Sequence, residues 1–305
     1  MTQTLETLNR NTKTLESIRG IVHTMKTLSA INARPYEHAV RSVEAYHKTI
    51  LQSFRAFSHR NGPLFLKQND TPAQVVVVFG SDHGMCGSYN ENVAAEVSRY
   101  LGTLESAGDP PHVLCVGAQL NDALMGRNVW AESYLLPPAS ADGIGRISGD
   151  IVTRLDDIRQ KSPFGEIAVS LIFTEQVLRG QHAPTTKMLL PLDPSIFGDA
   201  EDDPWISRSL PDFTMPPSDL LAALIRSHLF ASIFRASAEA LLTENAARLA
   251  QMQQAEQSVD DRLETLKSET RMVRQTDITN ELMDVIIGFE ALRKRRKKHK
   301  PKDIG

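Results

Sequence analysis

Apolar residues recur in steps of three and four along the last quarter of the chain, from Ser218 to Leu292. This stretch contains no proline and a single glycine, Gly288. The spacing is that of a narrow coiled-coil seam, with a one-residue slip in register after Val273. The seam positions are, in order, Leu242, Asn245, Leu249, Met252, Glu256, Val259, Leu263, Leu266, Thr270, Val273, Ile278, Leu282, Val285, Phe289 and Leu292. A helix this long, about 110 Å, needs a partner helix to cover its seam.

A second amphipathic pattern covers residues 4–34 and resumes from Ala39 to Phe57. Pro35 lies between the two halves and is expected to kink or break the helix near Ala33, because proline lacks an N–H and clashes with the preceding turn. Two long apolar-striped helices on either side of one domain predict an antiparallel coiled coil. The domain is then expected at one end of the coiled coil, with both chain termini directed towards the other.

The middle of the chain alternates between strand patterns rich in β-branched residues and amphipathic helix patterns. Strands are expected at 75–79, 112–116, 129–135, 166–174 and 185–192, the last two paired, and helices at 90–105, 118–125 and 144–161. This alternation predicts a Rossmann-like α/β domain. The fold class is therefore α/β plus long helices, an antiparallel coiled coil of N- and C-terminal helices with an inserted α/β domain. The expected parts are an N-terminal helix 1–61, the domain 72–192, a linker loop 193–217, a C-terminal helix 218–292 and a basic tail 293–305.

The formal net charge of −3 conceals an uneven distribution. Eight of the 34 Lys and Arg residues and one of the 37 Asp and Glu residues fall between Arg293 and Asp303, so the remainder of the chain carries a net charge of roughly −10. A basic run of this kind is able to hold nucleic acid or an anionic surface. It has no aromatic residues between its charges, so a solvated tail is favoured and no nucleic-acid partner is expected.

The two cysteines, Cys86 and Cys115, stand in no metal-ligand or redox spacing. Buried thiols in a reducing compartment are expected instead of a metal site. No run approaches the eighteen or so apolar residues that cross a bilayer. A soluble, cytoplasmic protein without direct membrane insertion is therefore expected, which leaves open that it sits on a membrane complex.

A glycine-rich turn, Gly80–Gly87, lies between an expected strand and an expected helix, where dinucleotide-binding folds hold phosphate. Its spacing is not G-x-G-x-x-G and it carries no lysine, so a tight turn that needs glycine dihedrals is favoured. A thiol nucleophile assembled from Asp82, His83 and Cys86 fits no familiar spacing, and a structural cysteine is preferred. No catalytic residue, cofactor or metal is assigned.

Several stretches resemble the F-type ATP synthase gamma subunit. They are Ile21–Lys26, Ser81–Gly87, Glu244–Leu249, Val273–Leu282 and Ile287–Leu292, and they stand in the same order as in that family. The resemblance covers nearly the whole chain and is most specific at its C-terminal end. It implies a rotor that turns inside a hexamer of alternating alpha and beta subunits. The globular end would stand on the membrane c-ring beside the epsilon subunit, at the cytoplasmic face of the cell membrane.

The resemblance also implies which residues contact these partners. Arg274 and Gln275 match a polar pair that engages a catch loop on the beta subunit. Met25 matches a position of the N-terminal helix packed near it, and Thr279 and Glu281 lie on the same contact region.

The end of a shaft should be apolar, because non-directional burial resists rotation less than specific hydrogen bonds do. The residues that fit such a bearing are Val285, Ile286, Ile287, Phe289 and Leu292.

Some positions depart from the family. His83 stands where the family usually has Arg, Ser88 where a second glycine is common, and the basic tail extends past the usual end. These departures favour a divergent branch, such as an alternate ATPase. A different class remains open, a coiled-coil scaffold or adaptor that dimerises through its seam and recruits an anionic partner with its tail. An enzyme that uses Gly80–Gly87 is a third alternative.

Overall fold

The computed structural model describes residues 4–62, 72–104, 110–162, 165–177, 181–197, 209 and 212–298. The chain divides into two compact units. One unit contains the chain up to Lys26 together with the chain from Met252 onward, and the other is Thr27–Gln251. The predicted boundaries between parts stay predictions, because this division cuts through both long helices.

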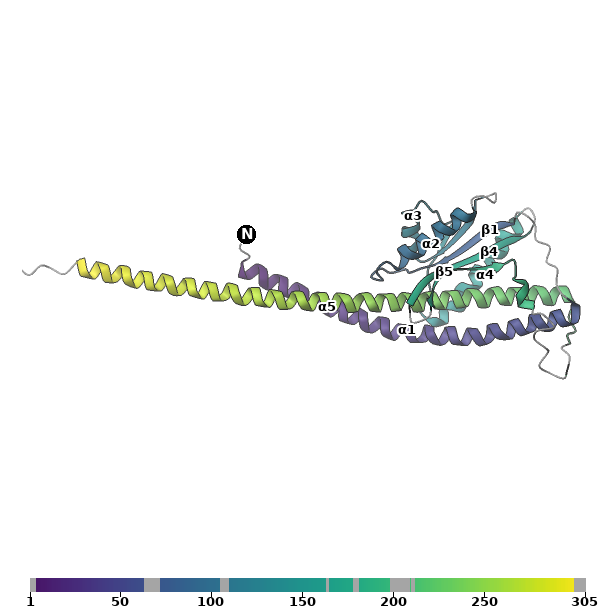
Figure 1. Ribbon diagram of the computed structural model, residues 1–305, viewed down its shortest axis with the longest axis horizontal. Coiled ribbons are helices and arrows are strands. Elements are labelled where there is room, and N and C mark those ends of the chain that lie inside the picture. Colours follow the sequence, from purple (N-terminus) through teal and green to yellow (C-terminus); the bar gives the residue numbers. More distant parts are fainter. Residues whose placement is uncertain are drawn as a thin grey trace, which may run out of the picture. The chain divides into compact units, whose positions relative to one another are not determined.

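Two helices run through both units, α1 (Leu5–Asn61) and α5 (Pro217–Lys298) (Figure 1). A kink or a break was expected at Pro35. Pro35 lies inside α1, so the helix does not break there. Pro35 is exposed, and water can therefore hydrate the carbonyl four residues earlier that the proline leaves without an N–H. The helix α5 continues to Lys298, past the predicted end at Leu292 and into the predicted basic tail. Residues 299–305 lie outside the described residues.

In the smaller unit, the start of α1 pairs with α5 in an antiparallel coiled coil. Arg19 Nε donates to Asp260 Oδ1 at 2.6 Å, and Lys26 further along α1 pairs with Glu256, which is earlier in α5. The partner's number falls as the number in α1 rises, so the two helices run in opposite directions. The buried seam side chains are Leu8, Val22, Met252, Leu263 and Leu266. The predicted pairing of the first and last helices is confirmed.

Glu256, a polar residue of the predicted seam, forms interactions across this helix pair. Its carboxylate lies 2.9 Å from His23 Nδ1 and also pairs with Lys26. Asn245 and Thr270, the other two polar seam residues, donate instead to the carbonyls of Leu241 and Leu266 in their own helix. Glu256 is therefore the seam residue suited to setting the register between the helices.

In the larger unit, five strands form one sheet in the order β3-β2-β1-β4-β5. They are β1 (Ala73–Phe79), β2 (His112–Val116), β3 (Ser133–Leu135), β4 (Ile167–Val177) and β5 (Gln181–Leu190). The first four are parallel. β5 pairs with β4 as predicted, and the structure shows that this pair is antiparallel. The helices between them are α2 (Tyr89–Leu104), α3 (Ala118–Met125) and α4 (Ile144–Lys161), with short 3-10 turns η1 (Ala141–Gly143) and η3 (Pro194–Phe197). β3 is shorter than the predicted 129–135, because only Ser133–Leu135 pairs with β2, whereas the Val129 N–H donates back to the carbonyl of Leu124.

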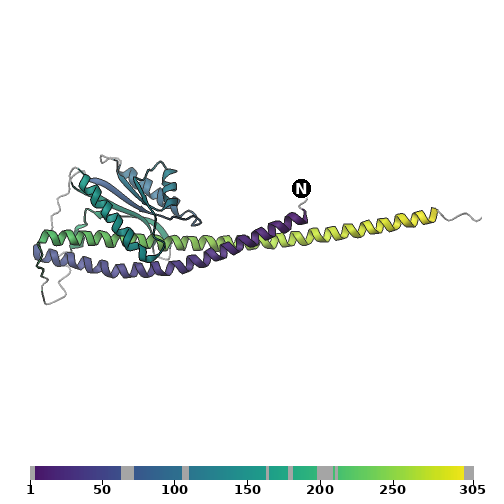
Figure 2. The same ribbon diagram turned by 180° about the vertical axis from the view of Figure 1, so that it is seen from behind.

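Helices cover both faces of this sheet (Figures 1 and 2), and each face has its own apolar core. On one face, Val76 and Val78 pack with α2 and α3. On the other, Val75, Val77 and Phe79 pack with α4 and with α5. The side chains of α5 in that core are Leu229, Ile233, Ala236 and Ala240. A segment of the long helix therefore serves as a covering layer of the sheet, which the sequence pattern did not indicate.

The same segment of α5 also packs against α1. Val43, Ile50 and Phe54 of α1 form a buried cluster with Ala231 of α5. Tyr36 of α1, Ile144 of α4, and Ala238 and Leu241 of α5 form another. The segment is buried on several sides, since it lies between the sheet and α1.

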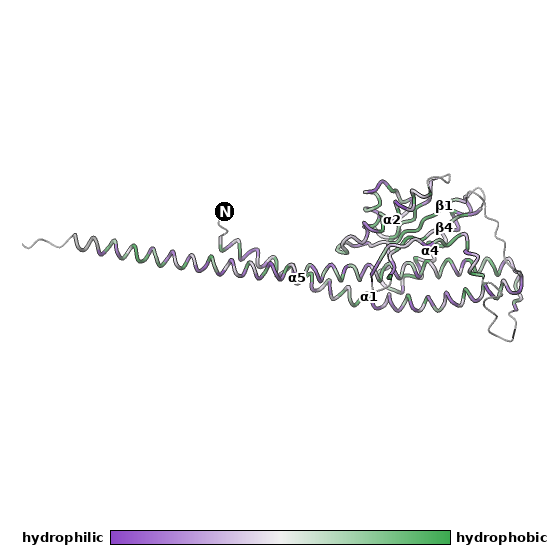
Figure 3. The backbone as a smooth tube through the Cα atoms, viewed as in Figure 1, coloured by the Kyte–Doolittle hydropathy of each residue, from purple (hydrophilic) through white to green (hydrophobic). Residues whose placement is uncertain are grey.

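Figure 3 shows hydrophobic residues concentrated in the strands and recurring from turn to turn along α1 and α5. Within the described residues, α5 also contains an 18-residue apolar window with few charged side chains, of which 33% is buried. By length and composition alone this window suffices to cross a membrane, contrary to the expectation that no such run exists. Core helices of soluble proteins pass the same test, so the window carries little weight.

Candidate functional site

The C-terminal end of α5, from Arg274 to Arg293, is exposed at every position. Arg274, Gln275, Thr279 and Glu281, which the sequence predicts as contacts for partner subunits, lie on this segment. The Thr279 hydroxyl donates to the carbonyl of Gln275 at 2.8 Å.

The apolar residues predicted to form a bearing are exposed all round this helix. Val285, Ile286 and Ile287 are 65%, 54% and 62% exposed, and Phe289 and Leu292 are 74% and 64% exposed. Consecutive helical positions differ by roughly 100° around the axis, so three consecutive apolar residues cannot share one stripe. A helix that is apolar all round is normally buried by surrounding protein. This end of α5 therefore fits a sleeve better than a single partner helix.

Met25 lies elsewhere along the same unit. The next residue, Lys26, pairs with Glu256, and Arg274 follows Glu256 by roughly 27 Å of helix. The structure therefore does not bring Met25 together with Arg274 and Gln275. Its role as a partner contact stays a prediction.

The turn after β1, residues 80–88, is shaped by two close backbone approaches. A Cβ on Gly80 would lie 2.4 Å from Leu120 Cβ of α3. Gly117, at the end of β2, has φ +112°, and a Cβ there would lie 2.6 Å from the carbonyl oxygen of Ser81. Only glycine fits either position, so this turn has the tight geometry that the sequence favoured.

Polar groups within the turn bond to one another. Ser81 N–H donates to Asn90 Oδ1 at 3.0 Å, and Asn90 Nδ2 donates to Ser81 Oγ at 2.7 Å. Gln119 N–H donates to the carbonyl of Ser81 at 3.1 Å. Cys86 is buried, and its Sγ lies 3.5 Å from Ser81 Oγ. The Ser81 amide, in the turn where a dinucleotide fold would hold phosphate, is thus already engaged.

Arg248 of α5 connects this turn to the long helix. Its Nη2 donates to the carbonyl of His83 at 3.1 Å and to Glu244 Oε1 at 2.6 Å, and its Nε donates to the carbonyl of Gly84 at 3.3 Å. The side chains of Arg248 and Glu244 are only 9% and 8% exposed. Burial raises the pKa of the Glu244 carboxyl, and the nearby Arg248 opposes that rise.

Tyr89, at the start of α2, forms a second connection to α5. Its buried hydroxyl donates to the carbonyl of Ala240 at 2.9 Å and lies 3.3 Å from Thr243 Oγ1. Burial raises the pKa of Tyr89 well above its usual value, so the hydroxyl stays protonated and donates. The hydroxyl of Thr243 in turn lies 3.1 Å from the carbonyl of Thr174 in β4.

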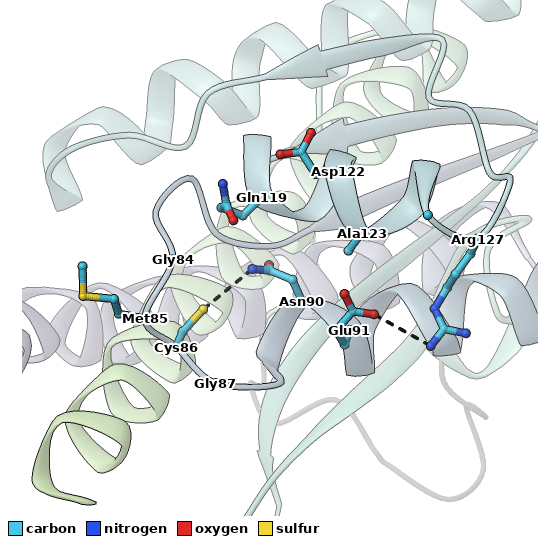
Figure 4. A pocket seen from close by; sticks show the side chains of 11 residues that line it. Gly84, Met85, Cys86, Gly87, Asn90, Glu91, Gln119, Asp122, Ala123 and Arg127 are labelled. Atoms are coloured by element: carbon cyan, nitrogen blue, oxygen red, sulfur yellow. Dashed lines mark hydrogen bonds and ion pairs between the residues drawn. The ribbon is translucent and has the colours of Figure 1, made fainter. Parts of the chain in front are cut away.

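A hollow of about 640 Å³ opens beside the turn, between α2 and α3 (Figure 4). Its charged lining residues are Glu91, Asp122 and Arg127, and Glu91 pairs with Arg127 at 4.0 Å. Two carboxylates against one guanidinium disfavour an anionic ligand. Across the part of the chain that the structure describes, no three His, Cys, Asp or Glu side chains are grouped so as to hold a metal ion.

The fold and the exposed end of α5 define a class of protein, in which an α/β domain is inserted between two long antiparallel helices, one with an exposed apolar end. A family model described as ATP synthase matches residues 4–292, and the chain belongs to that family. It is 26% identical to the ATP synthase gamma chain of Syntrophus aciditrophicus over 299 residues, 95% of this chain and 99% of that protein. It is 28% identical to the gamma chain of Maricaulis maris over 262 residues, 85% and 86% of the two chains.

Solved structures with the same fold agree. The rotor of the mitochondrial ATP synthase of Euglena gracilis aligns with a TM-score of 0.60 at 14% identity, over 90% of this chain and 98% of that one. A central stalk and c-ring structure of the mitochondrial ATP synthase of Tetrahymena thermophila contains a chain that aligns with a TM-score of 0.55 at 17% identity, over 77% and 99% of the two chains.

Sequence reasoning missed the contact between Arg248 and the turn. The stretches Glu244–Leu249 and Ser81–Gly87 both contributed to the family resemblance, and the structure brings them together. The hydrogen-bond acceptors are backbone carbonyls, so a motif of side chains does not indicate this contact. The family resemblance of both stretches was the one feature of the sequence that pointed to it. The ring of His83 is 84% exposed, so its departure from the family's Arg leaves this contact intact.

Proposed function

We propose that this chain is the central-stalk rotor of an F-type ATP synthase or ATPase, coupling rotation to ATP synthesis or hydrolysis and to ion translocation. The observation that carries the proposal is the exposed C-terminal end of α5, where apolar side chains lie on several sides of the helix and Glu290 is the one charged residue from Val285 to Leu292. A sleeve formed by a ring of alternating alpha and beta subunits suits such a helix. Apolar contacts without fixed hydrogen bonds let it turn inside the sleeve.

The polar residues just before the apolar end are proposed to contact the beta subunit. All four side chains are exposed, and they include charges of both signs: Arg274 is positive and Glu281 is negative, whereas Gln275 and Thr279 are neutral. Directional bonds from these side chains to one catalytic subunit at a time would make each face of the helix distinct to the ring. An asymmetric helix in a threefold ring then puts the three sites in different states as it turns.

The α/β domain is proposed to contact the epsilon subunit and the membrane c-ring. The chain would then lie peripherally, at the cytoplasmic face of the inner membrane, without inserting into it. The chain itself is proposed to be non-catalytic. Its glycine turn engages the Ser81 amide internally and carries no lysine, and the hollow beside it is lined by two carboxylates.

Co-expression of this chain with the alpha, beta and epsilon subunits of its own complex tests the proposal. A stable ATPase with one copy of this chain is the expected product, and the purified chain alone is expected to bind no ATP at micromolar concentration. If the chain forms a homodimer through α5 and associates with none of these subunits, it is a coiled-coil scaffold instead. ATP turnover by the isolated chain would also overturn the proposal.

A further inference from the structure

The contact between α5 and the turn after β1 consists of directional hydrogen bonds in a buried place. Arg248 donates to two consecutive carbonyls, those of His83 and Gly84, and to the carboxylate of Glu244. A buried guanidinium requires partners for its fixed fork of N–H donors. Both carbonyls belong to a turn whose position is fixed by Gly80 and Gly117. The geometry of each bond therefore depends on how α5 is rotated about its own axis.

The contacts with the α/β domain follow one face of α5. Ala240 accepts from Tyr89, Thr243 lies beside the carbonyl of Thr174, and Arg248 donates to the turn. A Cβ on Gly87 would lie 3.0 Å from Gln251 Oε1. Steps of three to five residues keep the positions 240, 243, 248 and 251 on neighbouring parts of one helical face. Rotation of α5 relative to the sheet would break these bonds together.

We propose that this face of α5 is where rotation of the helix is transmitted to the α/β domain, with Arg248 as the positioning residue. The inference rests on the proposed rotor function and adds to it the place where the torque passes. The apolar end of α5 contacts its surroundings without preferred direction, whereas charge-assisted hydrogen bonds hold a preferred angle. One helix would thus slip freely at one end and be fixed at the other.

A neutral replacement of the ion pair tests this without leaving a buried charge unpaired. The variant carries Glu244→Gln together with Arg248→Met, which keeps side-chain volume and removes all donation to His83 and Gly84. The chain offers a matched control in the same helix. Arg235 and Glu239 form another i,i+4 pair, with Arg235 Nε 2.8 Å from Glu239 Oε1. Among the described residues, this pair forms no hydrogen bond with the turn after β1. The control variant therefore carries Arg235→Met and Glu239→Gln.

The measurement uses the complex with alpha and beta subunits, fixed to a surface through the hexamer. A bead is attached to the α/β domain through Tyr134→Cys, since Tyr134 is exposed and both native cysteines are buried. With the complex stalled, the angular variance of the bead reports the torsional stiffness between hexamer and domain. We expect the variance to rise at least twofold in the Glu244/Arg248 variant and to stay at the wild-type value in the control. The ATPase rate in solution, without a bead, should stay within about twofold of wild type in both.

An unchanged angular variance in the Glu244/Arg248 variant would overturn the inference, as would an equal increase in the control. If that variant fails to assemble, Arg248→Lys replaces it. A single ammonium keeps the bond to Glu244 but cannot hold both carbonyls, so a smaller increase is expected and none would overturn the inference. A wild-type chain that forms no complex, or whose bead never turns with ATP, contradicts the rotor function itself. The two failures are therefore distinguishable.

Discussion

The imidazole of His47 in α1 lies directly against that of His228 in α5, with Nε2 of His47 3.2 Å from Nδ1 of His228. The two rings are stacked, with centroids 5.1 Å apart. Burial, together with the positive charge of a protonated His47, lowers the pKa of His228 to about 4. Burial also lowers the pKa of His47, with Arg235 adding to this and Glu44 opposing it. The packing of these two helices therefore requires a neutral histidine pair.

This pair predicts that acid weakens the larger unit. A base whose pKa is lower in the folded state contributes stability above its unfolded pKa, about 6.5, and that contribution is lost as the pH falls from there towards about 4. Between pH 7.5 and pH 5, His228 alone should account for about 2 kcal/mol of lost unfolding free energy. Urea unfolding at the two pH values measures this. In His228→Phe the difference should shrink by that amount, and an undiminished difference in this variant would contradict the role given to His228.

The exposed end of α5 predicts a separation between stability and assembly. Phe289→Ser combined with Ile286→Ser changes side chains that are already in solvent in the isolated chain. The free energy of unfolding should therefore change by no more than about 0.5 kcal/mol, while assembly with alpha and beta subunits should weaken. Leu263→Ala is the opposite case, because Leu263 is 6% exposed in the coiled coil. It should cost about 2–4 kcal/mol of stability. Equal assembly of Phe289→Ser/Ile286→Ser and wild type would contradict the proposed sleeve.

Glycines in the α/β domain predict substitution effects of opposite sign. In Gly117→Ala the new Cβ meets the Ser81 carbonyl at a φ of +112°, so the domain should lose more than about 2 kcal/mol. Gly149 in α4 has nothing within 4 Å of a built Cβ. Gly149→Ala should therefore stabilise the domain by about 0.5–1 kcal/mol. Thermal unfolding of the two variants measures both effects, and a tolerated Gly117→Ala would show that the turn is less constrained than its geometry indicates.

Local pattern was sufficient for most of the α/β domain. The strand at His112–Val116 and the helices at Ala118–Met125 and Ile144–Lys161 have their predicted bounds, because each buries one continuous run or one face. At Pro35 the pattern left a kink and a break both open, and α1 continues through the proline, where exposure lets water replace the missing backbone bond. The sequence shows that a proline is present, but it does not show whether the proline lies on the side of the helix that faces solvent.

Long-range packing lay beyond the sequence pattern. Between Leu229 and Leu241, α5 is buried both by the sheet and by α1, so its side chains follow no single seam. The bonds from Arg248 to His83 and Gly84 join residues 165 and 164 positions apart and end on backbone atoms. The apolar residues at the end of α5 were recognised from the sequence. The contacts proposed for them involve other subunits, so the sequence of this chain alone does not define those contacts.

The two cysteines provide a direct test of the thiol-enzyme alternative. Cys86 and Cys115 are 4% and 0% exposed, and burial raises the pKa of the Cys115 thiol to about 12. A nucleophilic thiol must be accessible and ionised near neutral pH. In the native chain at pH 8, neither cysteine should react with a thiol reagent within minutes, whereas both should react after unfolding in urea. Cys86→Ser should leave the ATPase rate of the assembled complex unchanged. Rapid labelling of the folded chain, or loss of activity in Cys86→Ser, would instead give the turn after β1 a chemical role.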